Sequence, residues 1–128
     1  MNRGNISHLL RNVGLLIFTD YLRFQVQRIK HRSKNRDFKK NNPTIKIPPD
    51  YLLYESFAIN YPAYYDGGRE SAKDLVKYFS KYKSQKNLNV LDWGCGPGRI
   101  IRHMPNLFEN GCKFYGTDNN ASVKLNIL

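Results

Sequence analysis

The stretch NLNVLDWGCGPGRI, residues 87–100, decides the fold class of this chain. A short apolar run, LNVLDW at 88–93, precedes three glycines in five positions, Gly94, Gly96 and Gly98. A run of this length and composition is typical of a buried strand in a parallel sheet. A glycine-rich turn that follows such a strand and leads into a helix places unpaired backbone N–H groups beside a crevice. Such groups favour a polar or anionic ligand group.

The residues after the glycines predict the rest of a β-α-β unit. A helix is predicted from Gly98 to His103, with Pro105 limiting its length. The run CKFYGTD, residues 112–118, predicts a second strand, and NNASVKLNIL, residues 119–128, predicts the start of another helix. The order strand, glycine turn, helix, strand is the pattern of a nucleotide-binding α/β fold.

The residues before the glycines predict helices. The periodicity of apolar residues and the turn-forming residues indicate the boundaries of each element. The predicted elements are an amphipathic helix over residues 6–29, a polar and basic linker over 30–43, a short helix over 51–58, a turn at Gly67 and Gly68, and an amphipathic helix over 69–83.

Six aromatic residues gather between the predicted linker and the predicted glycine turn. They could form a surface on which nucleic-acid bases stack. Packing of these rings onto a core is the favoured interpretation, because aromatic side chains bury large apolar areas. The six are Tyr51, Tyr54, Phe57, Tyr61, Tyr64 and Tyr65.

The spacing of the glycines discriminates between ligand classes. A mononucleotide phosphate loop needs a Gly-Lys dipeptide, and this chain has none. A dinucleotide fingerprint, G-x-G-x-x-G, needs a third glycine where this chain has Arg99, or Ile101 if the count starts at Gly96. The remaining pattern is two hydrophobic residues, then Asp-x-Gly-x-Gly-x-Gly, which runs from Val90 to Gly98.

This nine-residue string resembles the first motif of the class I, Rossmann-like S-adenosylmethionine-dependent methyltransferases. The acid Asp92 stands two residues before the first glycine, and Cys95 and Pro97 occupy positions where these residue types are common in that family. The resemblance covers roughly residues 48–128. It implies an α/β fold with a mainly parallel sheet, and an enzyme that uses S-adenosylmethionine to methylate an acceptor.

The resemblance also implies roles for individual residues. Asp118, at the end of the second predicted strand, would bind the ribose hydroxyls, because a carboxylate accepts hydrogen bonds from both. Asn119 would line the adenosine side, the backbone at residues 94–96 would face the methionine part, and Asp92 would hold the amino group or only hydrogen-bond the glycine turn. The predicted cofactor-binding residues are Asp92, Trp93, Gly94, Cys95, Gly96, Gly98, Asp118 and Asn119.

The two cysteines, Cys95 and Cys112, suggest neither a metal site nor a disulfide scaffold. A nucleophilic role for Cys95 is disfavoured, since no histidine partner is near it in sequence. So few cysteines indicate a reducing compartment, and we predict a cytoplasmic protein. No run of about 18 apolar residues occurs, so no transmembrane segment is predicted.

The chain is expected to be an N-terminal fragment of a longer enzyme. Residues 1–47 are predicted as a basic helix and linker. Residues 48–128 are predicted as a partial methyltransferase domain with lid helices and the first two strands, truncated at its C-terminus. Catalytic residues are expected beyond Leu128. For this reason we expect weak or no cofactor affinity and no turnover from the chain by itself.

The net charge of +11 is concentrated in the N-terminal segment. Residues 1–50 have eleven Lys and Arg against three Asp and Glu, a balance of +8, whereas residues 51–128 have ten against seven, a balance of +3. The basic segment could attract an anionic partner, either nucleic acid or a membrane surface. One alternative function is therefore a nucleic-acid-binding module that uses this basic segment. A second alternative, unrelated to the charge, is a nicotinamide-dependent oxidoreductase, which the failed dinucleotide spacing of the glycines disfavours.

Overall fold

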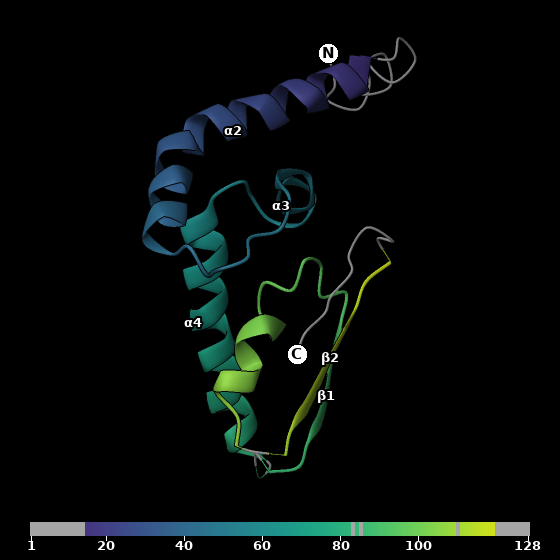
Figure 1. The fold of residues 1–128 in the computed structure, drawn as a ribbon. Coiled ribbons are helices and arrows are strands. Elements are labelled where there is room, and N and C mark those ends of the chain that lie inside the picture. Colours follow the sequence, from purple (N-terminus) through teal and green to yellow (C-terminus); the bar gives the residue numbers. More distant parts are fainter. Residues whose placement is uncertain (1–14, 83, 85, 110, 120–128) are drawn as a thin grey trace.

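The structure, a computed structural model, describes residues 15–82, 84, 86–109 and 111–119. Within these residues it is a mixed α/β structure, in which three α-helices precede a two-stranded parallel sheet (Figure 1). The predicted helical residues 6–14 and 120–128 lie outside the described residues. The division into domains at residue 47 stays a prediction.

Helix α2 extends from Leu15 to Asn41 and includes most of the predicted linker. The linker prediction over residues 30–43 is therefore wrong up to Asn41. The segment was predicted as a linker because most of its residues are polar. Two of them, Asn35 and Phe38, face inward and are buried. They lie three residues apart, on one face of the helix, and Phe38 packs in a cluster with Ile59 and Tyr61. The helix ends just before Pro43, whose ring disfavours helical geometry at the preceding residue.

Helices α3 and α4 follow. Helix α3 spans Asp50–Ser56, close to the predicted helix over 51–58. Helix α4 spans Tyr61–Ser80 and begins eight residues before the predicted start, so the prediction of a turn at Gly67 and Gly68 is wrong. The N-terminal cap of α4 is Asn60, whose side chain accepts a hydrogen bond from the Ala63 amide at 3.2 Å.

The glycine pair in α4 has a packing role. A Cβ atom on Gly68 would collide with the backbone carbonyl of Arg99, so only glycine allows this approach. Tyr64, one helical turn earlier, is fully buried and donates a hydrogen bond to the Pro97 carbonyl at 2.6 Å. Helix α4 therefore lies directly against the segment that follows the first strand.

The strands β1, Asn89–Trp93, and β2, Lys113–Thr117, confirm the two predicted strands. They pair in parallel, with Leu91 opposite Tyr115. A 3₁₀ helix, η1, spans Ile101–Asn106 between them, three residues later than the helix that was predicted from Gly98 to His103. Gly98 has a φ of 78°, which is incompatible with a helix start, and Pro105 lacks the N–H that an α-helix would need there.

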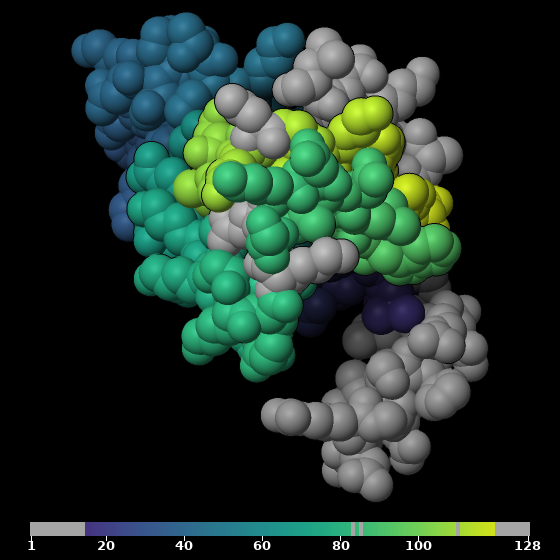
Figure 2. All heavy atoms as spheres, turned by 90° about the horizontal axis from the view of Figure 1, so that it is seen from below, coloured from purple at the N-terminus to yellow at the C-terminus, as the bar shows by residue number. Residues whose placement is uncertain are grey.

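In the part of the chain that the structure describes, the core consists of two clusters, and α4 contributes residues to both. The first contains Phe38, Leu53, Ile59, Tyr61 and Tyr64, and the second contains Ala72, Cys95, Ile101 and Met104. In the view of Figure 2, α4 in teal lies against the β1–β2 region in green to yellow. Packing of the aromatic residues is confirmed for Tyr61 and Tyr64, whereas Tyr51 and Phe57 are exposed.

The sheet is covered on one face only within the described part of the chain. Val90 and Phe114 pack on the second cluster. Leu91, Trp93 and Tyr115 point to the other face, where they are 57%, 85% and 51% exposed. Parallel sheets are normally buried on both faces, so this apolar face is unusual for a parallel pair.

The contact between α4 and Arg99 generates a test with a matched control. The substitution Gly68→Ala should lower the free energy of unfolding by about 1–3 kcal/mol, because the new methyl group forces the backbones apart. Gly67→Ala, in the same helix, meets only the end of the Arg99 side chain at 4.0 Å. That control should raise stability by about 0.5–1 kcal/mol, as expected for alanine in a helix interior. Urea unfolding monitored by circular dichroism measures the free energy of unfolding of both variants. A change of the same sign in the two variants would contradict the close contact between α4 and the Arg99 backbone.

Candidate functional site

The glycine loop, residues 94–98, lies at the carboxyl end of β1, beside the end of β2. Gly94, Gly96 and Gly98 have φ angles of 73°, 52° and 78°. Other residues adopt these angles only with strain. The alternation of glycines is therefore required by the backbone path of the loop.

Hydrogen bonds from the loop amides attach the loop to the end of β2. Thr117 O accepts from the Gly94 amide at 2.7 Å and from the Cys95 amide at 3.0 Å, and Asp118 Oδ2 accepts from the Gly96 amide at 2.8 Å. The sequence predicted that these N–H groups are unpaired and face a ligand. In the structure they are used within the protein, and the predicted ribose ligand Asp118 helps to hold the loop.

Two adjoining cavities lie between the glycine loop and α3. One, of about 200 Å³, is lined by Phe57, Asp92, Cys95 and Arg99 among others. The other, of about 350 Å³, is lined by Leu52, Glu55, Asp118 and Asn119 among others. Both share Ser56, Gly94, Gly96 and Pro97 as lining residues.

The glycines keep space open at these cavities. A Cβ on Gly94 would have nothing within 4 Å, so this residue borders open space. A Cβ on Gly96 would lie 3.4 Å from Ser56 Cβ, across the gap to α3. Any side chain at position 96 would therefore occupy space that borders both cavities.

Burial controls the charge state of the groups at the smaller cavity. Asp92 is half-buried, and desolvation raises the pKa of its carboxyl group. Desolvation, and then the nearby carboxylates of Asp92 and Asp118, raise the pKa of the Cys95 thiol. The protonated thiol of Cys95 is consequently favoured over the thiolate.

The structure brings together Asp92, Gly94, Cys95, Gly96 and Asp118, as the sequence predicted, with Asn119 at the larger cavity. The side chain of Trp93 points to the exposed face of the sheet and lines neither cavity. Gly98 is buried and also lines neither of them.

Sequence reasoning missed the opposite wall of the cavities. Ser56 and Phe57 come from the end of α3, and the guanidinium of Arg99 lies 4.9 Å from the centre of the Phe57 ring. Arg99 follows Gly98 directly, and this place next to the glycine motif could have indicated that it lies at the site. The approach of α3 is a long-range contact, and no local pattern in residues 50–57 indicates it.

The described part of the chain contains no group of three or more His, Cys, Asp or Glu side chains arranged to hold a metal ion. Among the same residues, no helix combines the length and the apolar character needed to cross a membrane. Comparison of the chain with protein-family models, with curated proteins and with solved structures gives no match.

Asp92 generates a test based on pH. Because burial raises the pKa of Asp92 on folding, the folded chain binds the proton more tightly than the unfolded chain does. The ionised carboxylate therefore lowers stability above the folded-state pKa, and this effect fades as the pH falls towards the ordinary value of about 3.9. Asp92→Asn should raise the urea midpoint at pH 7, with a gain that shrinks towards pH 4.

The control for this test is Asp74→Asn. Asp74 lies on α4 with a side chain that is 78% exposed, 3.8 Å from Lys77 Nζ. Its replacement should change the midpoint little at any pH, since exposed pairs contribute little to stability. A gain for Asp92→Asn that is absent at pH 7, or that is equal at all pH values, would contradict the assignment of Asp92 as a desolvated carboxylate.

Proposed function

We propose that the glycine loop and its two flanking acids form the cofactor site of a class I, Rossmann-like S-adenosylmethionine-dependent methyltransferase. One observation carries the proposal. A glycine loop with three positive φ angles lies between Asp92 on β1 and Asp118 just after β2, at the carboxyl ends of paired parallel strands. Ligands of open α/β sheets bind at that edge.

The hydrogen-bonding character of the site favours this cofactor over a nucleotide bound through phosphates. A phosphate needs donors, and three of the loop amides already donate to Thr117 and Asp118. The side-chain groups that border the loop include two carboxylates, which are acceptors. S-adenosylmethionine presents donors and positive charge, namely an ammonium group, ribose hydroxyls and a sulfonium. A nicotinamide dinucleotide has a pyrophosphate, which would find these loop amides already used and carboxylates nearby. The site therefore disfavours a nicotinamide dinucleotide.

The residues present fit the parts of this cofactor. Asp118 would accept hydrogen bonds from the ribose, because a carboxylate has about four acceptor positions and can serve both the loop and a ligand. Asp92, at the smaller cavity, would pair with the ammonium group. Arg99 lines the same cavity and would pair with the carboxylate of the methionine part.

When bound, the cofactor supplies an electrophilic methyl group, and the residues of this chain hold and orient it. Gly94 and Gly96 leave room for the cofactor, and α3 closes the cavities from the other side. Cys95 and Cys112 are thiols rather than halves of a disulfide, and a reducing cytoplasm is the location that we propose for the enzyme.

Ligand-observed NMR tests the proposal. S-adenosylmethionine and S-adenosylhomocysteine should both show saturation transfer from the chain, compete with each other, and bind weakly, on the order of millimolar Kd. Asp118→Asn keeps an oxygen for the Gly96 amide and removes the charge. It should weaken binding roughly tenfold, since hydrogen bonds to charged groups contribute about 1.5–3 kcal/mol.

The controls distinguish this site from diffuse charge attraction and from a dinucleotide site. Asp74→Asn, which removes an exposed charge on α4, should bind like the unmodified chain. The nicotinamide dinucleotide should give no saturation transfer. The proposal fails if the dinucleotide competes with S-adenosylmethionine, or if Asp118→Asn binds S-adenosylmethionine as well as the unmodified chain.

A further inference from the structure

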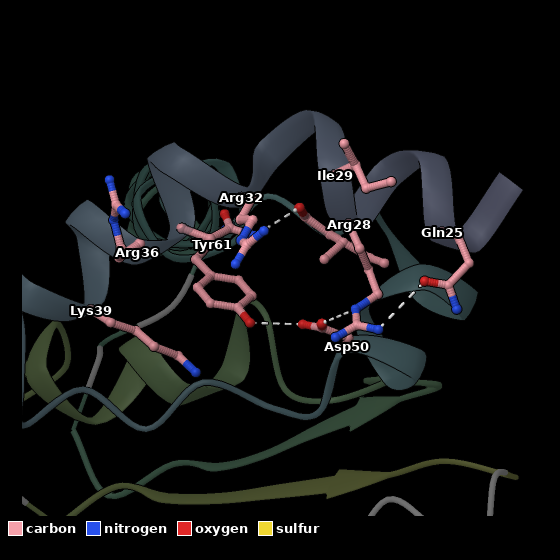
Figure 3. Close-up of a pocket in the computed structure, with 10 residues that line it drawn as sticks. Gln25, Arg28, Ile29, Arg32, Arg36, Lys39, Asp50 and Tyr61 are labelled. Atoms are coloured by element: carbon pink, nitrogen blue, oxygen red, sulfur yellow. Dashed lines mark hydrogen bonds and ion pairs between the residues drawn. The ribbon is translucent and has the colours of Figure 1, made fainter.

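A cation-lined groove of about 520 Å³ lies between α2 and the starts of α3 and α4 (Figure 3). Four cations of α2 line it, Arg28, Arg32, Arg36 and Lys39, at successive spacings of four, four and three residues. This spacing places them along one side of the helix, about 6 Å apart for each four-residue step. The residues that line the groove include one acid, Asp50.

The acid of the groove is already paired. Asp50 Oδ2 lies 3.0 Å from Arg28 Nε, and Asp50 Oδ1 accepts a hydrogen bond from the Tyr61 hydroxyl at 2.7 Å. Burial and this hydrogen bond raise the pKa of Tyr61 to about 12, so Tyr61 remains a neutral donor. Four cations and one carboxylate give the lining of the groove a charge of +3, and Arg36 also forms an exposed ion pair, at 3.9 Å, with Asp37, which is not a lining residue.

The floor of the groove is built from contacts within the protein. Asn35 is buried, its Nδ2 donates to the Ile59 carbonyl at 3.1 Å, and its Oδ1 accepts from the Tyr61 amide at 2.9 Å. Lys39 Nζ lies 5.1 Å from the centre of the Tyr61 ring. Because these contacts fix α2 on α4, the shape of the groove is set before any ligand arrives.

We propose that this groove binds the phosphodiester backbone of single-stranded nucleic acid. Three of its four cations are arginines, whose planar guanidinium groups match phosphate oxygens. The row of cations along α2 has a spacing comparable with that of successive phosphates in an extended strand. A bilayer is flat and would reach only the rim of a groove that is bordered by α2, α3 and α4.

The groove is close to the glycine-loop cavities. Helix α3 begins with Asp50 in the groove and ends with Ser56 at both cavities, and its seven residues span about 10 Å. A strand in the groove would therefore pass within a few nucleotides of the loop. The inference that the bound strand is the methyl acceptor rests on the proposed function. The inference that the groove binds a strand does not.

Fluorescence anisotropy with the full chain and a labelled oligonucleotide of roughly ten nucleotides tests the groove. Because Arg28 is paired with Asp50, contacts of Arg32, Arg36 and Lys39 with three phosphates predict a slope of about −2.1 for log affinity against log salt, at about −0.7 for each phosphate. The double variant Arg32→Gln with Arg36→Gln should make the slope shallower by about 1.4. At 0.1 M salt it should lower affinity about 25-fold, since each lost contact removes about fivefold.

The matched control is Lys30→Gln with Lys34→Gln. Lys30 and Lys34 are also four residues apart on α2, and neither lines the groove. Their substitution removes the same charge as the substitution of the two arginines. Their loss should change affinity and slope much less than the loss of the two arginines. Circular dichroism of each variant checks that the helices are retained. Equal effects of the two double variants would overturn the proposal, because binding would then depend only on diffuse charge.

Two further probes separate other anionic ligands from a strand. Tripolyphosphate that competes as well as the oligonucleotide, mole for mole, would indicate a compact polyphosphate site and overturn the proposal. Binding to phosphatidylglycerol vesicles that depends on Arg32 and Arg36, without oligonucleotide binding, would indicate a membrane surface and also overturn it. Asp118→Asn should bind the oligonucleotide normally, so failure of the cofactor site and failure of the groove are distinguishable.

Discussion

The close approach of α4 to the backbone of Arg99 is the constraint on which the rest of the structure depends. Glycine at position 68 allows the helix to contact the carbonyl of Arg99, and Tyr64 donates to Pro97 one turn earlier. These two contacts position the glycine loop against the helical part of the chain. Arg102 extends the attachment by donating to the Lys46 carbonyl at 2.6 Å, so the segment before α3 is fixed to the same region. The cavities between the loop and α3 exist because these contacts hold both walls.

The attachment of the loop to β2 decides which ligands the site suits. Donation of the Gly94, Cys95 and Gly96 amides to Thr117 and Asp118 uses the backbone N–H groups that a phosphate would need at the loop. Two carboxylates remain at the loop, and burial of Asp92 disfavours its charged form unless a cation is near. A ligand with an ammonium group would relieve that desolvation. The loop geometry and the electrostatics therefore favour the same ligand class for separate reasons.

The sequence predicted the features that depend on local patterns. The strands β1 and β2, the glycine loop and the two acids follow from alternation, length and spacing within about thirty residues. The start of α4 and the extension of α2 could not be predicted in this way. Gly67 and Gly68 indicate a turn unless the contact with Arg99 is known, and residues 30–41 look like a solvated linker unless the burial of Asn35 and Phe38 is known. For the same reason the Ser56, Phe57 and Arg99 wall was missed, because it depends on how α3 docks.

The position of the charges says more about function than the net charge does. Helix α2 has eight Lys and Arg against two Asp, so it contributes +6 of the total of +11, and its cations line a groove at one end of α3. At the other end of α3, about 10 Å away, the glycine loop is bordered by carboxylates. A short helix thus separates a surface that suits a polyanion from a cavity that suits a cationic ligand. Under the proposed function, this separation would keep an anionic strand and the cationic groups of the cofactor at different ends of α3.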